Sequence, residues 1–151
     1  MKSKKTINSS HIETLLSCPF VHHVRGRCEK FRINFSLSLT SDCLCISDGD
    51  TTDGFFDPPT RTSPGTLCLS VMGKELSEIY HTLAHEFCHL EQWVRDDALW
   101  VKWMKRSSRK STLALERRTE EEALEMLKRW NLYDDSMLDR MNKYLRRLEN
   151  S

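Results

Sequence analysis

The spacing of apolar residues changes at Gly73, and this change constrains the fold more than any other feature of the sequence. Before Gly73, apolar and polar residues alternate over 31–39 and again over 67–71, which is typical of half-buried strands. After Gly73, apolar residues recur every three to four positions, which predicts helices at about 74–95, 97–106, 112–131 and 135–149. Because strands come first and helices follow, the sequence predicts an α+β fold. We expect a short twisted antiparallel or mixed sheet in the N-terminal half, packed against a mainly helical C-terminal half.

The N-terminal region carries weaker signals. Residues 1–8 are polar and basic, and we expect them to be flexible. Ser10 followed by Glu13 is a capping-box pattern, which predicts a short helix that ends before Pro19. We also expect a short strand at 43–46 and a loop over 47–65, where Asp, Gly and Pro are frequent.

The composition is that of an ordinary globular protein. A chain of 151 residues without internal repeats or a long linker is expected to form one domain spanning 1–151. Its formal charge of +1 argues against a dedicated nucleic-acid binder, and it contains no apolar run of the ~18 residues that a membrane span needs. The basic N-terminus is not followed by the apolar segment of a secretion signal. The sequence therefore predicts a soluble, cytoplasmic protein.

The chain contains six cysteines, and without a secretion signal we expect them to be reduced. A small metal site is the alternative, because several metal-ligating residues lie close together in the N-terminal half. Its spacing matches no ordinary zinc-finger pattern, so free thiols are the preferred interpretation. The residues of this alternative are Cys18, His22 or His23, Cys28, and Cys43 or Cys45.

The clearest chemical signal is an HExxH motif in the predicted helix at 74–95. It places His85 and His89 one turn apart on one helix face, where both imidazoles can reach a single zinc ion. Glu86 points to the side of such an ion, where a carboxylate can take a proton from an attacking water. The pattern therefore predicts a catalytic zinc site with Glu86 as the general base.

A catalytic zinc ion usually has three protein ligands, and no histidine follows His89, so the third ligand is expected to be a carboxylate. Glu120 lies in the middle of the apolar stripe of the predicted helix at 112–131, where an unpaired carboxylate would be costly. Glu120 is therefore the first candidate. Glu116, also on the stripe, is the alternative ligand, and a salt bridge of Glu120 with a basic side chain is the alternative without a metal.

Hydrolysis also needs a group that stabilises negative charge on the reacting carbonyl oxygen. His81, Tyr133 and Tyr144 are candidates, and the sequence does not choose among them. His81 lies one turn before His85, too far along the helix axis for one ion to bind all three histidines. We therefore expect His81 to lie beside the site and not to be a ligand.

The HEFCH motif at 85–89, followed some thirty residues later by EEEA at 120–123, resembles the compact gluzincin ("minigluzincin") metallopeptidases. Small HExxH proteins of that kind are common in bacteriophages and prophages. The resemblance covers about residues 65–130. One difference concerns the position four residues after the third-ligand glutamate, which is often Asp or Asn in such families; four residues after Glu120 this chain has Leu124.

The resemblance implies two helices packed against a short twisted sheet, with one zinc ion held by His85, His89 and Glu120 and with Glu86 as general base. It also implies that the strand at 66–72 is the edge strand that binds an extended peptide. The expected function is zinc-dependent hydrolysis of a peptide or protein, in the cytoplasm and, if the gene is phage-borne, in that of an infected bacterium. A zincin-fold protein that binds a host or regulatory partner without catalysis, or a hydrolase of a non-peptide substrate, is the alternative.

Overall fold

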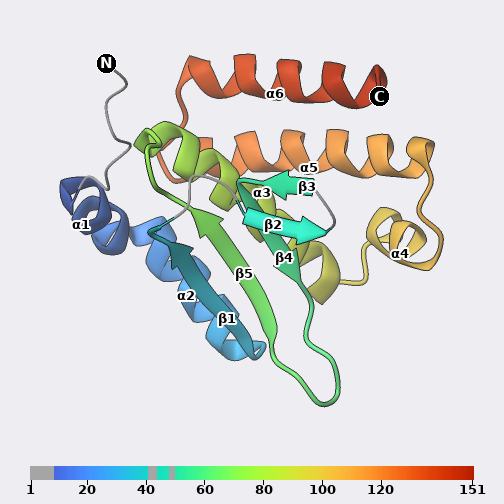
Figure 1. Cartoon of the computed structure of the whole chain (residues 1–151), viewed down its shortest axis with the longest axis horizontal. Helices are drawn as coiled ribbons and strands as arrows, with labels where there is room; N and C mark the ends of the chain where they lie inside the picture. The colour runs from blue at the N-terminus through green and yellow to red at the C-terminus, as the bar shows by residue number, and fades with distance from the viewer. Residues whose placement is uncertain (1–8, 41–43, 48–49) are drawn as a thin grey trace.

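The computed structural model describes residues 9–40, 44–47 and 50–151, so the predicted flexible tail at 1–8 lies outside the described residues (Figure 1). A small mixed sheet in the N-terminal half packs against a mostly helical C-terminal half, which confirms the α+β prediction. In the described part of the chain, no helix is long and apolar enough to cross a membrane.

Two helices precede the sheet. Helix α1 (Ser9–Ser17) ends before Pro19, as predicted. Helix α2 (Pro19–Lys30) was not predicted, because Pro19 is a stop signal for the preceding helix and also a favoured first residue of a new one. Helix α2 ends at Lys30 and is capped by Phe31, and Arg32 adopts a left-handed conformation with φ of 58°. The predicted strand at 31–39 therefore begins two residues late.

The main sheet has three strands, in the order β1-β5-β4. Strand β1 (Ile33–Ser38) is parallel to β5 (Gly65–Ser70), and β4 (Gly54–Asp57) is antiparallel to β5 on its other side. Strand β5 thus lies in the centre of the sheet. The expectation that the strand at 66–72 is an edge strand is therefore wrong, because both of its edges are already paired.

The predicted loop at 47–65 contains regular structure. Strands β2 (Leu44–Ser47) and β3 (Asp50–Thr52) form an antiparallel pair, and β4 follows directly after Asp53. Gly54 begins β4 because the strand passes very close to helix α3: a Cβ atom there would lie 2.7 Å from Thr82 Cγ2. The turn-forming residues of this segment separate short strands and do not form one long loop.

The four predicted C-terminal helices are all present. Helix α3 (Leu76–Val94) contains the HExxH motif and is followed by α4 (Ala98–Lys105), α5 (Arg109–Arg129) and α6 (Asp135–Glu149). Figure 1 shows that α5 runs across α3 and that α6 lies along α5. The core lies between the sheet, α2 and the helical half, and includes Phe20, Leu67, Leu69, Leu83, Phe87, Leu90 and Leu127, all at most 2% exposed.

Candidate metal centre

Helix α3 is covered on two sides. Its apolar side, which includes Ile79, Leu83 and Phe87, packs into the core as the sequence predicts. Its polar side is also buried, because α5 and α6 lie on it; His81 and His89 are 6% and 7% exposed. Buried polar groups need partners, and each histidine on this side contacts a carboxylate of α5.

Three side chains converge near the middle of α3. The Nε2 atoms of His85 and His89 are 3.2 Å apart, and the Glu116 carboxylate of α5 lies 2.8 Å from the first and 3.4 Å from the second. Ligands held about 2.0–2.1 Å from a tetrahedral zinc ion are separated by about 3.3 Å. His85, His89 and Glu116 form the group in the described residues that can hold a metal ion, with ligand atoms all within 4.8 Å of one another.

Glu120, the first candidate for the third ligand, lies outside this group. Its Oε2 atom is 2.8 Å from Nε2 of His81 and 3.7 Å from Nδ1 of His85, on the side of the His85 ring away from Glu116. The side of α5 that faces α3 carries both glutamates, one turn apart. The way α5 crosses α3 sets Glu116 against the pair His85–His89, and Glu120 one turn earlier on α3.

The ring orientation of His89 is set by Gln92. Nδ1 of His89 lies 2.9 Å from Oε1 of Gln92, and the amide nitrogen of Gln92 donates to Thr119 at 2.9 Å. Because an amide oxygen can only accept, Nδ1 of His89 carries the ring proton and Nε2 presents a lone pair. This lone pair points toward His85 and Glu116, which is the arrangement that a metal ligand requires.

One oxygen of Glu116 has no hydrogen-bond partner among the described residues. This atom, Oε2, is buried, and although it is 2.8 Å from Nε2 of His85, the contact does not have hydrogen-bond geometry. A buried carboxylate oxygen without a donor costs about 1–3 kcal/mol or more. A cation between the carboxylate and the two imidazoles would remove this cost, so the three side chains could hold a metal ion.

The electrostatics of the site favour a positive charge at this point. Burial alone would lower the pKa of His85, but the adjacent Glu116 carboxylate raises it well above its usual value. Burial would raise the pKa of both glutamates of α5, but the imidazoles outweigh it: His85 holds the pKa of Glu116 far below normal, and His81 and His85 lower that of Glu120 to about 2. Both carboxylates are therefore ionised at neutral pH.

Glu86 differs from these two carboxylates. Burial raises the pKa of Glu86, and the charges of Glu116 and Glu120 raise it further, against a lowering by His85 and His89. A carboxylate with a raised pKa that is only partly buried is a better proton acceptor than an ordinary surface glutamate. The environment of Glu86 therefore suits the general base that the motif predicts.

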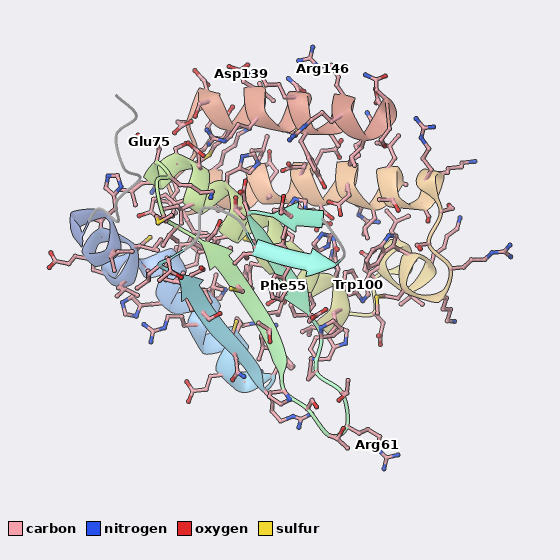
Figure 2. The ribbon with its side chains drawn as sticks, viewed as in Figure 1. Phe55, Arg61, Glu75, Trp100, Asp139 and Arg146 are labelled. Carbon is pink, nitrogen blue, oxygen red and sulfur yellow. The ribbon has the colours of Figure 1, made fainter. Side chains whose placement is uncertain are left out.

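Aromatic side chains from two other helices border the site. The ring of Tyr144 in α6 lies edge-on to His85, with centroids 5.9 Å apart, and burial together with the surrounding carboxylates raises its pKa. The ring of Trp100 in α4 lies 5.4 Å from His89 and also contacts Phe56 of β4. Figure 2 shows Trp100 on the side of α4 that faces the sheet.

The three candidates for stabilising a carbonyl oxygen have different surroundings in the structure. Tyr144 lies at the metal-ligand cluster. His81 is hydrogen-bonded to Glu120. Tyr133 packs against the hydrophobic core, and Nζ of Lys128 lies 5.0 Å from its ring centre. Tyr144 is therefore the candidate that the structure brings to the site.

The alternative cysteine site does not form a metal-ligand group in the described residues. Cys18, Cys28, Cys68 and Cys88 are free thiols, as expected. Burial raises the pKa of Cys28 to about 11, so this thiol is protonated at neutral pH. Cys43 and the side chain of Cys45 lie outside the described part of the chain.

Two residues of the site were given no role from the sequence. Gln92 has a signal, since it lies three residues after His89 and therefore on the same helix face. Arg140, which contacts His81 from α6, has no such signal, because the two residues are 59 positions apart and no sequence pattern connects them.

Comparison of the chain with protein-family models, with curated proteins and with solved structures found no match.

Proposed function

We propose that this protein is a zinc-dependent peptidase whose metal is held by His85, His89 and Glu116, with Glu86 as general base. The observation that carries the proposal is the convergence of two imidazole nitrogens and a partnerless carboxylate oxygen at ligand spacing. The Glu of the HExxH motif favours catalysis over a structural metal site, because a structural site has no use for a base beside the ion.

One position of the compact gluzincin pattern agrees better with Glu116 than with Glu120 as the ligand, although the Glu-x-x-Ala spacing fits Glu120, since Thr119 lies three residues after Glu116. The families that this chain resembles often have Asp or Asn four positions after the third-ligand glutamate. With Glu120 as the ligand, that position is Leu124. With Glu116 as the ligand, it is Glu120, whose carboxylate lies beside Nδ1 of His85, where it can orient the ring.

A bound zinc ion would lower the pKa of a water molecule at the site and polarise the scissile carbonyl. Glu86 takes the proton of the attacking water and returns it to the leaving amine nitrogen. The hydroxyl group of Tyr144 donates a hydrogen bond to the carbonyl oxygen as negative charge develops on it. Its raised pKa keeps this hydroxyl protonated at neutral pH, as a donor requires.

Strand β4 is the natural place for an extended peptide. It contacts α3 through Gly54 and Thr82, one turn before His85, and in the described residues it pairs with a strand on one side only. A substrate that adds to the free edge of β4 would use main-chain hydrogen bonds, which favours peptides over non-peptide substrates. We therefore assign peptide binding to β4, and not to β5 as the resemblance implied.

The proposal is tested by zinc content and by hydrolysis of a denatured, fluorescently labelled casein. The wild-type protein is expected to contain one zinc ion per chain and to cleave casein. Glu86→Gln is expected to keep the zinc and lose at least 100-fold in cleavage rate, because it removes the base but no ligand. Glu116→Gln is expected to lose both zinc and cleavage.

Three results would contradict parts of this proposal. Wild-type protein without stoichiometric zinc would remove the metal site. Full zinc without any cleavage would leave the non-catalytic, partner-binding alternative. Normal zinc content in Glu116→Gln together with loss in Glu120→Gln would restore Glu120 as the ligand.

A further inference from the structure

We infer that His81 and Arg140 are positioning residues of the metal centre, which act through Glu120 to hold the ligand His85 in place. This inference rests on the proposed function, because it requires that His85 binds a metal. It adds Arg140 to Tyr144 as a second residue of helix α6 that shapes the site, although α6 carries none of the proposed metal ligands.

The residues form a continuous chain of contacts. Oε2 of Glu120 lies between two imidazoles of α3, 2.8 Å from Nε2 of His81 and 3.7 Å from Nδ1 of His85. On the far side of the His81 ring, Nε of Arg140 donates to Nδ1 at 3.4 Å. This series of contacts thus runs from α6 to His81 on α3, then to Glu120 on α5, and returns to α3 at the ligand His85.

Arg140 and Glu120 together fix the tautomer and the orientation of the His81 ring. An arginine nitrogen can only donate, so Nδ1 of His81 must accept and the ring proton resides on Nε2. Nε2 can then donate to Glu120, which orients the carboxylate toward His85. The Glu120 carboxylate also requires the proton on Nε2, because it can only accept. Without Arg140, Nδ1 of His81 loses its donor and the ring loses one of the two contacts that hold it, so the donor to Glu120 is less firmly positioned.

Arg140 is itself held in place. Its two terminal nitrogens donate to Ser77 at 2.7 Å and to Ser136 at 3.1 Å, and the hydroxyl groups of these serines are 3.1 Å apart. Ser77 lies in the first turn of α3, and Ser136 in the first turn of α6. The guanidinium group therefore joins the N-terminal ends of both helices. The imidazole of His81 lies between this group and Glu120, on the side of the metal centre.

The inner part of this network, at His81 and Glu120, is buried. His81 is 6% exposed and Glu120 is 4% exposed, so water cannot easily replace a missing partner of Glu120. If His81 is removed, Glu120 keeps only its long contact with His85. The His85 ring then loses a fixed support on its Nδ1 side, which is the position where support for a metal ligand is most effective.

The experiment measures the metal centre directly, with the full chain loaded with zinc or with Co²⁺. His81→Leu and Arg140→Leu are compared with Arg146→Leu, a change on the same helix, where Figure 2 shows Arg146 pointing outward, away from α5. The readouts are the rate of zinc transfer to a chromogenic chelator and the visible absorption spectrum of the Co²⁺ protein. Loss of a residue that supports a metal ligand typically costs 10–100-fold in metal affinity.

We expect His81→Leu and Arg140→Leu to release zinc about 10–100-fold faster and to change the Co²⁺ spectrum, while Arg146→Leu behaves as wild type. His81→Gln provides a rescue, because its amide nitrogen can donate to Glu120 while its oxygen accepts from Arg140. It is expected to restore release to within a few-fold of wild type. Thermal unfolding of the metal-free variants shows whether each one folds.

The outcomes separate this inference from the proposed function. If wild-type protein takes up neither zinc nor Co²⁺, the proposed function fails. If wild type binds the metal but His81→Leu and Arg140→Leu release it at the wild-type rate with an unchanged spectrum, only the positioning role is wrong. If His81→Gln is as defective as His81→Leu, the hydrogen-bond mechanism is wrong as well.

Discussion

Oε1 of Gln92 lies 2.9 Å from Nδ1 of His89, and Gln92 is fully buried, with 0% exposure. Among the described residues, the amide oxygen of Gln92 is hydrogen-bonded to His89 and so holds the ring of this histidine. Its amide nitrogen is held by Thr119, whose hydroxyl group donates to the main-chain oxygen of Leu115 at 2.7 Å. A change at Gln92 should therefore appear first in the metal affinity.

Gln92→Met keeps most of the side-chain volume and removes the acceptor for Nδ1 of His89. We expect zinc affinity to fall about 10–100-fold, because the ring is no longer held in the tautomer that presents Nε2. Competition with a chelator of known affinity measures this. Thr119→Ser, which keeps the hydroxyl group, is the control; an equal loss in both variants would point to a packing defect.

Tyr144→Phe removes one hydroxyl group at the site. If this group stabilises the carbonyl oxygen, kcat should fall about 100–1000-fold with little change in KM, since the interaction forms mainly in the transition state. Zinc content should stay unchanged. Tyr133→Phe is the matched control in the same half of the chain and should keep wild-type kinetics. An unaltered kcat in Tyr144→Phe would remove this tyrosine from the mechanism.

Zinc should stabilise the folded protein, because the three ligands come together only when α3 and α5 are packed. Free zinc at 1000 times its dissociation constant adds about 4 kcal/mol to the free energy of unfolding. For a chain of this size the corresponding increase in melting temperature is roughly 10 °C. Differential scanning calorimetry with zinc and with a chelator measures it. The same zinc-dependent shift in Glu116→Gln would show that zinc binds elsewhere.

Asp97 predicts a pH-dependent contribution to stability. Its carboxylate caps α4 through the Leu99 amide at 3.0 Å and contacts Arg95 and Arg118 at 3.2 and 3.1 Å. Burial alone would raise the pKa of Asp97, but the Leu99 amide and the two arginines lower it below the usual value. A lowered pKa means that the stabilisation is complete above about pH 4 and is lost as the pH falls through the folded-state pKa.

We therefore expect Asp97→Asn to lose about 1–3 kcal/mol of unfolding free energy at pH 7, and the difference from wild type to shrink below pH 4. Urea unfolding at several pH values measures this. Asp96→Asn is the control: Asp96 is exposed and has a φ of 51°, which Asn tolerates well. A loss at Asp97 that is independent of pH would contradict the electrostatic explanation.

Two glycines predict opposite effects of the same substitution. Gly54→Ala should destabilise the fold by about 1–3 kcal/mol, because the new Cβ would lie 2.7 Å from Thr82 Cγ2 and 2.9 Å from Leu69 Cδ2. Gly26→Ala should stabilise it by about 0.5–1 kcal/mol, because Gly26 lies inside α2 with nothing within 4 Å of its added Cβ. Chemical denaturation compares both; Gly54→Ala together with Thr82→Ser should recover part of the loss.

The sequence was a good guide where a pattern extends over many residues. The helices at 74–149 and the strands around Phe35 and Leu67 were predicted. In these segments the spacing of apolar residues stays regular over two or more helical turns or over several alternations. Helix α2 was missed although its apolar residues are spaced as in a helix, because Pro19 was interpreted as an end and not as a beginning. Strand β4 was missed because its four residues lie between turn-forming neighbours.

The site was predicted only as far as a single helix determines it. His85, Glu86 and His89 are neighbours by helix geometry, and the structure keeps them so. Glu116 and Glu120 share one face of α5, and local geometry cannot say which of them lies against both His85 and His89. That depends on how two helices cross, since a shift of one turn, about 5.4 Å, exchanges the two.

The paired acids of α5 also bear on how such a centre tolerates change over evolutionary time. The second carboxylate, that of Glu120, is already ionised, buried and in contact with the histidines of α3. If the glutamate that binds the metal were lost in evolution, a small shift of one helix along the other would bring the second glutamate into its place. Related chains could thus share one chemistry while their third ligands fall at sequence positions that do not align.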